Sequence, residues 1–261
     1  MFTTNHFIWL AVCAVCIAAG LGYLINRRPR LSSVLTAFCL VCIASECVKV
    51  LSCIEMVPGK DGQTMYPYLP LAHLPFHLCS IQIAFIFYTR FSHNERLRTA
   101  LLAFMYPSCL AGAMLALLMP SIVPGSVAVE DMFHAPLAYQ YFLYHSALIV
   151  LGAYIPLSGA VDIKPKHYLS SLGILLGLGF ASIYLNSAFA SPRYENGELV
   201  GLDYVTNFFF TYEPPFDLGI SEKWQWMLYA AAIALLAAAV IALLYAPYFV
   251  KAKRAKSRER G

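Results

Sequence analysis

The chain has 261 residues, of which 60% are hydrophobic and 12% are charged, and its mean hydropathy is +0.65. Soluble domains have about 25% charged residues, so this composition argues against a soluble protein and predicts an all-α, polytopic membrane domain over residues 1–261. The formal net charge of +4 comes from basic residues that sit in particular loops and in the tail. Membrane topology accounts for these residues, so nucleic-acid binding is not expected.

Seven stretches are long and apolar enough to cross a bilayer, which takes about 20 residues of helix. They are predicted at about Phe7–Ile25, Leu31–Met56, Leu71–Phe91, Leu97–Met119, Ala138–Leu157, Tyr168–Phe189 and Trp224–Val250. No Lys or Arg precedes the first stretch, which indicates a retained span rather than a cleavable signal peptide. In the sixth stretch, Gly173 and Gly177 have the spacing of a close helix–helix contact.

The basic residues predict the orientation of these spans. Of the 18 Lys and Arg residues, 14 lie in the loops 26–30, 90–98 and 158–167 and in the tail 251–261, all on one side of the predicted membrane. Cytoplasmic segments are rich in Lys and Arg, so the N-terminus is predicted outside and the C-terminus in the cytoplasm. The tail is expected to contact anionic lipid headgroups. The sequence predicts no particular protein partner.

The eight cysteines are mostly in apolar runs. Cys13 with Cys16, and Cys39 with Cys42, have the spacing of metal ligands but no polar neighbours. Inside lipid-buried helices such cysteines are typical small packing residues. No disulfide framework, metal or cofactor is therefore predicted from them.

Polar residues gather in the outer half of the predicted bilayer. The third span opens with His73-Leu-Pro-Phe-His-Leu-Cys-Ser-Ile-Gln82. At 1.5 Å of rise per residue, Cys79 lies roughly 12 Å from the outer surface, His145 roughly 10 Å and Glu46 roughly 15 Å. Asn186 lies near the outer end of the sixth span. Polar residues at membrane depth usually face a cavity or a partner, so these four helices predict an outward-facing intramembrane pocket.

The chemistry that suits this set is acyl transfer or hydrolysis on lipid. A thiolate is the nucleophilic form of cysteine, and a histidine at similar depth can take its proton, which assigns Cys79 and His145 as the catalytic residues. Glu46 is expected to orient the histidine, and the amides of Asn186 or Asn207 to stabilise an oxyanion. His77, Lys49 and Gln82 complete the expected pocket.

Two other functions remain open at this point. Glu46 and Lys49 are three residues apart in one span, and such a charged pair also suits a transporter or a small-ligand binding protein. His73 and His77, spaced as i and i+4, could join His145 in a metal-dependent membrane hydrolase, although Pro75 interrupts the helix between them.

Four short stretches carry a resemblance to a known family. They are Leu74-Pro-Phe-His-Leu-Cys-Ser80, Gly112-Ala-Met-Leu-Ala-Leu-Leu-Met-Pro120, Tyr141-Phe-Leu-Tyr-His-Ser146, and Asn207-Phe-Phe-Phe with Pro214 following. In this order and spacing they resemble the YwaF-like (TP-type) family of bacterial integral membrane proteins, which is similar to the eukaryotic transmembrane protein 164 family. The resemblance covers the chain from about the second span to the seventh and implies a bacterial cytoplasmic (inner) membrane location.

What the resemblance implies is lipid acyltransferase chemistry with a cysteine and a histidine in membrane helices. A looser similarity to androgen-induced-type membrane hydrolases, which use a threonine and a histidine, points the same way. His145 matches the histidine of the family's fifth helix, and Pro75 and His77 match its third-helix motif. The family cysteine stands where this chain has Phe76, and Cys79 follows three residues later, on about the same helix face.

Overall fold

The computed structural model describes residues 3–120, 133–195, 197–212 and 222–258. The helices are α1 (Thr4–Arg27), α2 (Leu31–Cys53), α3 (Leu78–Phe91), α4 (Glu95–Pro107), α5 (Ala113–Leu118), α6 (Pro136–Leu157), α7 (Lys166–Ala188) and α8 (Glu222–Arg258). Short 3-10 turns are η1 (Leu71–His73) and η4 (Phe208–Phe210), and η2 (Ser108–Gly112) is a π-helical turn. The strands form two antiparallel hairpins, β1 (Glu55–Pro58) with β2 (Met65–Tyr68) and β3 (Ser191–Glu195) with β4 (Glu198–Asp203).

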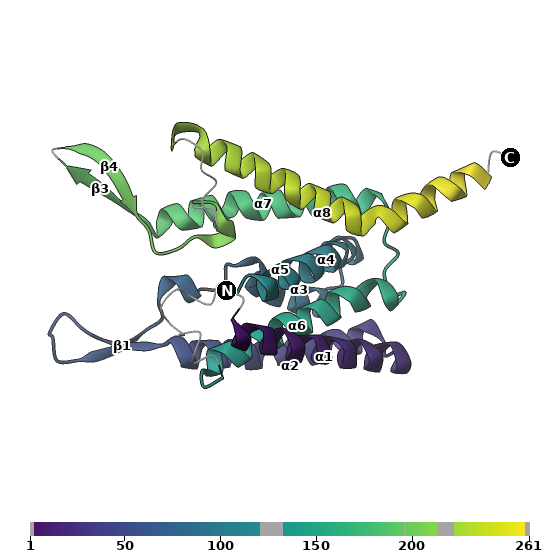
Figure 1. Cartoon of the computed structure of the whole chain (residues 1–261), viewed down its shortest axis with the longest axis horizontal. Coiled ribbons are helices and arrows are strands. Elements are labelled where there is room, and N and C mark those ends of the chain that lie inside the picture. The colour runs from purple at the N-terminus through teal and green to yellow at the C-terminus, as the bar shows by residue number, and fades with distance from the viewer. Residues whose placement is uncertain (1–2, 121–132, 196, 213–221, 259–261) are drawn as a thin grey trace.

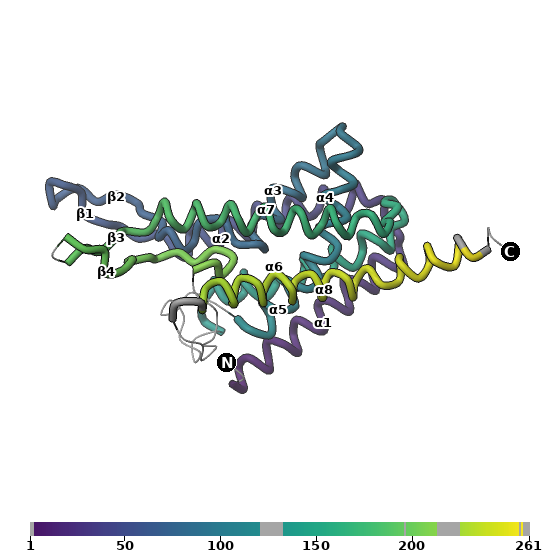
Figure 2. Tube along the Cα trace, turned by 90° about the horizontal axis from the view of Figure 1, so that it is seen from above, coloured from purple at the N-terminus to yellow at the C-terminus, as the bar shows by residue number. Residues whose placement is uncertain are grey.

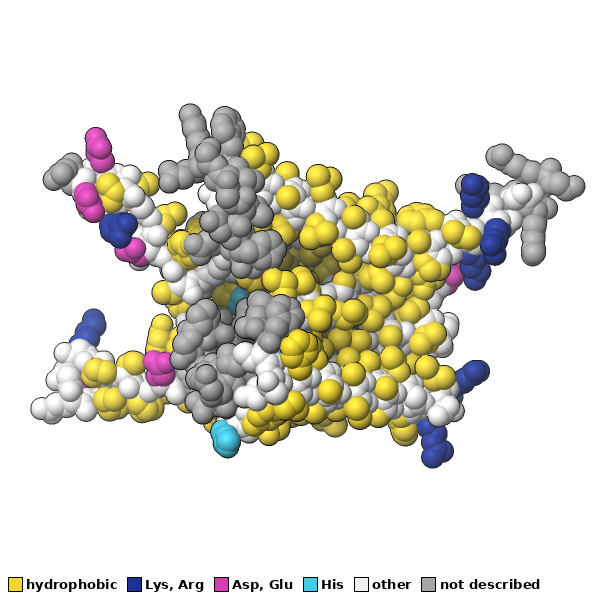
Figure 3. Space-filling view, in the orientation of Figure 1, with side chains coloured by type: hydrophobic (Ala, Val, Ile, Leu, Met, Phe, Trp, Pro, Cys, Tyr) yellow, Lys and Arg dark blue, Asp and Glu magenta, His cyan; other side chains and the backbone are white. Residues whose placement is uncertain are grey.

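The long helices run side by side and both hairpins project from the same end of the bundle, while α8 carries the C-terminus to the other end (Figures 1 and 2). On the face shown in Figure 3, hydrophobic side chains cover the middle of the bundle and charged side chains gather at its two ends. A chain that crosses lipid must present such an apolar belt and satisfy its backbone hydrogen bonds internally.

In the part of the chain that the structure describes, five helices are long and apolar enough to cross a membrane: Thr4–Arg27, Leu31–Cys53, Glu95–Leu118, Lys166–Ala188 and Gln225–Ala255. They correspond to the first, second, fourth, sixth and seventh predicted spans. The third prediction began too early, because α3 starts only at Leu78 and has 14 residues. α6 has 22 residues, but its tyrosines, Gln140 and His145 reduce its apolar character. Among the described residues, length and composition therefore support five of the seven predicted crossings.

The polar character of α6 is explained by its place in the bundle. α6 contacts α1, α2, α4, α5 and η2, and its side chains from Phe142 to Ile155 are largely buried. A helix surrounded by other helices does not need an all-apolar surface, because its polar groups meet protein rather than lipid. α6 is thus the element against which α1, α2, α4 and α5 assemble.

A proline shapes the middle of the fourth span. Pro107 has no N–H, so the carbonyl of Ala103 loses its usual partner four residues on. The hydroxyl of Tyr245 on α8 donates to this carbonyl at 2.9 Å, and Ser171 on α7 donates to it at 3.3 Å. The π-helical turn η2 follows directly, as is common where a helix ladder is interrupted. The interruption therefore holds α7 and α8 against α4.

Close helix packing occurs at Gly152 rather than at the predicted glycine pair. A Cβ added to Gly152 would lie 2.9 Å from Cβ of Cys109 and 3.0 Å from N of Leu110, whereas one added to Gly173 or Gly177 would meet no atom within 4 Å among the described residues. The prediction that Gly173 and Gly177 mediate a close helix–helix contact is therefore wrong for the helices of a single chain. Spacing alone identified two glycines on an open face.

Gly152→Ala is expected to lower the free energy of unfolding by about 1–3 kcal/mol, because the added methyl group would press on backbone of the adjacent turn η2. Thermal unfolding of the purified protein in detergent measures the effect. Gly177→Ala, on an open helix face, serves as the matched control and should leave the unfolding temperature unchanged or slightly raised. Equal unfolding temperatures for the two variants would contradict the close contact.

Candidate functional site

The candidate site begins where α3 begins, inside the bundle. After η1 the chain runs through Leu74–Phe76 without helical structure, and His77 takes the position just before the first turn of α3 with no side-chain cap. Proline is poorly tolerated within a helix interior, which explains why Pro75 lies outside α3. The first N–H groups of a helix have no carbonyl partner in the helix, so this end of α3 presents free donors and a partial positive charge.

Cys79 is the second residue of α3 and lies at this helix terminus. Its thiol accepts a hydrogen bond from the backbone N–H of Ser80 and interacts with the imidazole of His145 on α6. Cys79 is partly buried, and His145 is 3% exposed. A helix N-terminus and a neighbouring imidazole both favour a thiolate over a thiol. The two residues assigned from the sequence as a catalytic pair are therefore neighbours.

The orientation of the His145 ring is fixed by its own helix. Nδ1 lies 2.6 Å from the carbonyl oxygen of Tyr141, and a carbonyl can only accept, so Nδ1 carries the proton. In neutral histidine, Nε2 then has a free lone pair. Nε2 is buried and has no partner of regular hydrogen-bond geometry among the described residues, so its interaction with the thiol of Cys79 is a loose one. The ring thus presents its unprotonated nitrogen, Nε2, to the thiol.

Two further side chains hold this region together. Tyr144, one residue before His145, donates its hydroxyl hydrogen bond to the carbonyl oxygen of Cys79 at 3.1 Å and so ties α6 to the first turn of α3. Gln82 is 1% exposed and bonds Ser108 at 3.0 Å and the Cys109 thiol at 3.4 Å, both on η2. Sequence reasoning included Gln82 but missed Tyr144, although Tyr144 stands inside the motif 141–146.

Glu46 does not perform the expected role of orienting the histidine. Its carboxylate lies 2.8 Å from the ammonium of Lys49 on the same helix, and the carbonyl of Tyr141 holds the His145 ring instead. The side chain of Lys49 is 11% exposed and lies within electrostatic range of Cys79 and His77. Because both charges of the pair belong to α2, the pair does not span two moving elements, as a coupling element of a transporter would.

Asn186 and Asn207 hold the loop around Phe208, which packs against the start of α3. The amide of Asn186 pairs with the backbone N–H and C=O of Phe208 at 3.0 and 3.1 Å and also donates to Thr211 at 2.9 Å. Asn207 accepts from the N–H of Tyr212 at 3.0 Å. The ring of Phe208 is fully buried and packs edge-on against His77, with centroids 4.9 Å apart. The Asn186 amide is therefore occupied in holding Phe208 against the start of α3.

This loop has an unusual backbone. Phe209 and Phe210 have φ values of 58° and 52°, in the left-handed region that bulky residues rarely adopt. Such conformations persist only where surrounding contacts hold them. Here Asn186 bonds Phe208, and Trp226 on α8 donates to the Thr211 carbonyl at 2.6 Å. The strained turn is the means by which the Phe208 ring reaches α3.

The three histidines of the predicted metal site do not form one. Among the described residues, no group of three or more His, Cys, Asp and Glu side chains is arranged to hold a metal ion. His77 bonds the backbone of Ala72 and packs on Phe208. His73 lines a cavity of about 300 Å³ at the C-terminal end of α2, and His145 faces Cys79. The metal-dependent alternative lacks its ligand set.

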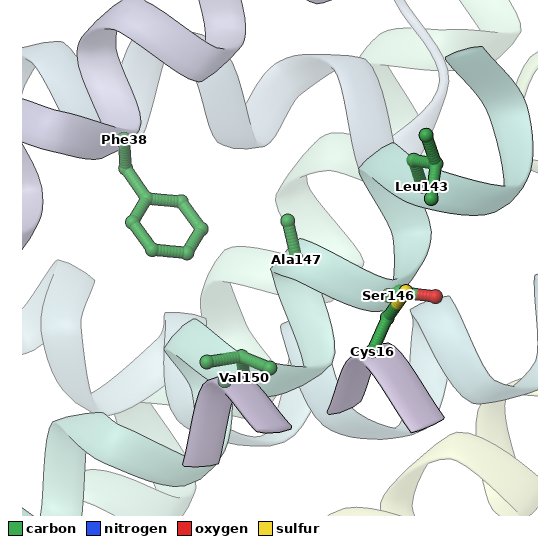
Figure 4. A pocket seen from close by; sticks show the side chains of 7 residues that line it. Cys16, Phe38, Leu143, Ser146, Ala147 and Val150 are labelled. Carbon is green, nitrogen blue, oxygen red and sulfur yellow. The ribbon is translucent and has the colours of Figure 1, made fainter. Parts of the chain in front are cut away.

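A second hollow lies on the opposite face of α6. This groove of about 210 Å³ between α1, α2 and α6 is lined by Cys16, Gly20, Phe38, Leu143, Ser146, Ala147 and Val150 (Figure 4). Its walls are almost entirely apolar, and none of the residues assigned to the site lines it. The groove lacks a nucleophile–base pair, so it does not compete with Cys79 and His145 as a place for chemistry.

Comparisons with known proteins give one match, and it covers the whole site. No curated protein and no solved structure matches this chain. The model of the TMEM164 family matches residues 1–245, which include every residue of the candidate site and leave out the end of α8 and the basic tail. This match agrees with the transmembrane protein 164 side of the resemblance noted in the sequence. The match extends over nearly the full length, and the chain belongs to the TMEM164 family.

Proposed function

We propose that this protein is a membrane-embedded enzyme that transfers or hydrolyses lipid acyl groups, with Cys79 as nucleophile and His145 as general base. The observation that carries the proposal is the buried, unengaged Nε2 of His145 beside the Cys79 thiol, with Nδ1 held by the Tyr141 carbonyl. Membership of the TMEM164 family is compatible with a membrane enzyme of lipid metabolism. The Glu46–Lys49 pair gives less support to a transporter, because both charges sit on one helix.

The first half-reaction forms a thioester. Nε2 of His145 takes the thiol proton, and the Cys79 sulfur attacks the carbonyl carbon of an acyl ester in the lipid. The ester C–O bond breaks, the acyl group stays on sulfur, and the departing alkoxide receives the proton from the imidazolium. In the second half-reaction His145 deprotonates an acceptor hydroxyl or water, which attacks the thioester and returns the sulfur to the thiol. A lipid hydroxyl gives acyl transfer and water gives hydrolysis.

The negative charge on the tetrahedral intermediate requires donors that are already in place. The first-turn N–H groups of α3 surround Cys79 and lack helical partners, so we place the oxyanion there. The unengaged Nε2 of His145 is a separate indication that a reacting group belongs at this terminus. Asn186 does not contact the oxyanion in this scheme. It acts indirectly, by holding Phe208 and the start of α3 in position.

The proposal includes a topology. With the N-terminus outside and the basic tail in the cytoplasm against anionic headgroups, Cys79 and His145 lie in the outer half of the bilayer, where the ester carbonyls of outer-leaflet lipids are found. The membrane is the cytoplasmic (inner) membrane of a bacterium. With α3 and α6 crossing the bilayer as well as the five long helices, the chain has seven spans. An odd number of spans is what this orientation requires.

Acyl-enzyme trapping tests the proposal. Wild-type protein incubated with a phospholipid that carries isotope-labelled acyl chains should gain one acyl mass, which neutral hydroxylamine removes and peptide mapping locates on Cys79. Cys47→Ala is the matched control. It removes an exposed cysteine on a different helix, α2, and should retain the adduct. An adduct of equal yield in Cys79→Ala would overturn the assignment of the nucleophile.

A further inference from the structure

A cavity opens next to the candidate site, at the outer end of α2. It has a volume of about 300 Å³ and is lined by Ser52, Cys53, Ile54, Glu55, His73, Ala135, Pro136 and Leu137. These residues come from the end of α2, from η1 and from the start of α6, so the same three segments that lead into the site surround the cavity. It is therefore positioned to hold the part of a lipid that lies outward of the reacting ester.

Lys49 is a neighbour of residues in both the cavity and the candidate site. It is one helical turn below Cys53, and its charge acts on Cys53 and His73, which line the cavity, and on Cys79 in the site. Its ammonium has three N–H donors, of which one reaches Glu46 at 2.8 Å. Among the described residues it has no second hydrogen-bond partner. A cation buried to this degree with unfilled donors is costly unless an anion completes its coordination.

We propose that Lys49 binds the phosphodiester of the lipid whose acyl ester reacts at Cys79, with the headgroup in the cavity lined by His73 and Cys53. The phosphate and the acyl esters of a glycerophospholipid are joined through the same three-carbon glycerol, so a phosphate at Lys49 places an ester carbonyl close to the start of α3. This inference rests on the proposed acyl chemistry, but the binding step is measurable without it.

The charges around Lys49 favour this role. Glu46 pairs with Lys49 and partly offsets the cost of burying the cation, and Cys53, one helical turn further along α2, lines the cavity. The other carboxylate there, Glu55, is exposed to solvent at the rim, where water and salt weaken its repulsion of a phosphate. The remaining titratable neighbours are His73 and His77, which carry no negative charge, and the thiols of Cys53 and Cys79.

Native mass spectrometry of the full-length protein in detergent tests this binding. The probes are dioleoyl phosphatidylcholine, dioleoyl phosphatidylglycerol and dioleoylglycerol, which has the same chains without the phosphate. Wild type is expected to retain one phospholipid of either headgroup in preference to dioleoylglycerol. Lys49→Met should weaken phospholipid binding about tenfold or more and leave dioleoylglycerol unchanged, because it removes a charge-assisted hydrogen bond to phosphate.

Two matched variants sharpen the comparison. Lys49→Arg should keep binding within about threefold of wild type, since it preserves the charge. Lys60→Met, in the exposed turn between β1 and β2, removes a lysine far from the cavity and should change nothing. Soluble glycerophosphocholine should not compete at concentrations where phospholipid binds, which distinguishes a lipid phosphodiester from a free one. Equal phospholipid binding by wild type and Lys49→Met overturns the proposal, as does an equal loss of phospholipid and dioleoylglycerol.

A second arm separates this inference from the proposed chemistry. In His145→Ala, turnover should be lost while the Lys49-dependent preference for phospholipid persists. A wild type that binds phospholipid through Lys49 but turns over no ester would refute the chemistry and keep the binding site. A wild type that turns over phospholipid and dioleoylglycerol equally well, with the same ratio in Lys49→Met, would refute the binding site and keep the chemistry.

Discussion

Cys79→Ala and His145→Ala are each expected to lower the turnover of phospholipid acyl esters by at least about a thousandfold. The first removes the atom that forms the thioester. The second removes the base, because the imidazole faces the thiol through Nε2 while Nδ1 is held by Tyr141. The double variant should be no slower than the slower single variant, since the two residues act as one unit. Release of labelled fatty acid, or its transfer to a lysolipid, measures these rates.

The controls for this experiment come from the same residue types. Cys47→Ala and His93→Ala alter exposed side chains outside the site and should leave turnover unchanged. Thermal unfolding of every variant shows whether the fold survives. Turnover that persists in Cys79→Ala but disappears in His145→Ala would place the nucleophile on another group. Turnover that persists in both would refute the proposed reaction at this pair.

Asn186→Ala is expected to cost about 2–4 kcal/mol of stability and to release the Phe208 loop. The substitution leaves the backbone N–H of a fully buried phenylalanine without its partner, which costs about 1–3 kcal/mol. It also removes the bonds from the Asn186 amide to the Phe208 carbonyl, which keeps its bond from Thr211, and to the Thr211 hydroxyl. Hydrogen exchange at the Phe208 amide, which bonds Asn186 directly, should accelerate at least about thirtyfold. Turnover should fall as well, because Phe208 packs on His77 at the start of α3.

Ser187→Ala is the neighbouring control. Ser187 makes a single exposed hydrogen bond to Tyr212, so its removal should change stability by no more than about 0.5 kcal/mol and leave exchange at Phe208 slow. Unchanged exchange at Phe208 in Asn186→Ala would show that the loop is held by its ring contacts alone. Asn186 would then have no role in positioning Phe208 against the start of α3.

The position of the candidate site was predictable because depth in a membrane is nearly linear in sequence. Counting residues from the outer ends of two spans placed Cys79 and His145 at similar depth, and the two side chains are in contact. Of the seven spans predicted from the apolar runs, five correspond to long apolar helices among the described residues, with boundaries close to those observed. A rise per residue is a property of the helix itself, so it requires no knowledge of which helices are neighbours.

The remaining features depend on neighbours, which the sequence does not specify. Glu46 had both the charge and the depth to orient His145, but a backbone carbonyl one turn away on the same helix does so. Asn186 had the amide expected of an oxyanion donor, and it is occupied by Phe208. Gly173 and Gly177 had the right spacing, yet the close approach is at Gly152. In each case the residue type was informative and the partner was decided by packing.

The short length of α3 constrains how the protein is made. A 14-residue helix that opens with polar residues is too short to be retained in a bilayer by the translocon on its own, which requires about 20 apolar residues. α3 must enter the lipid together with the longer segment Glu95–Leu118, to which it is joined by residues 92–94. His145 emerges from the ribosome only after both. A nascent chain therefore carries Cys79 into the membrane before His145 has been synthesised, and the proposed acyl chemistry has to wait until α6 is inserted.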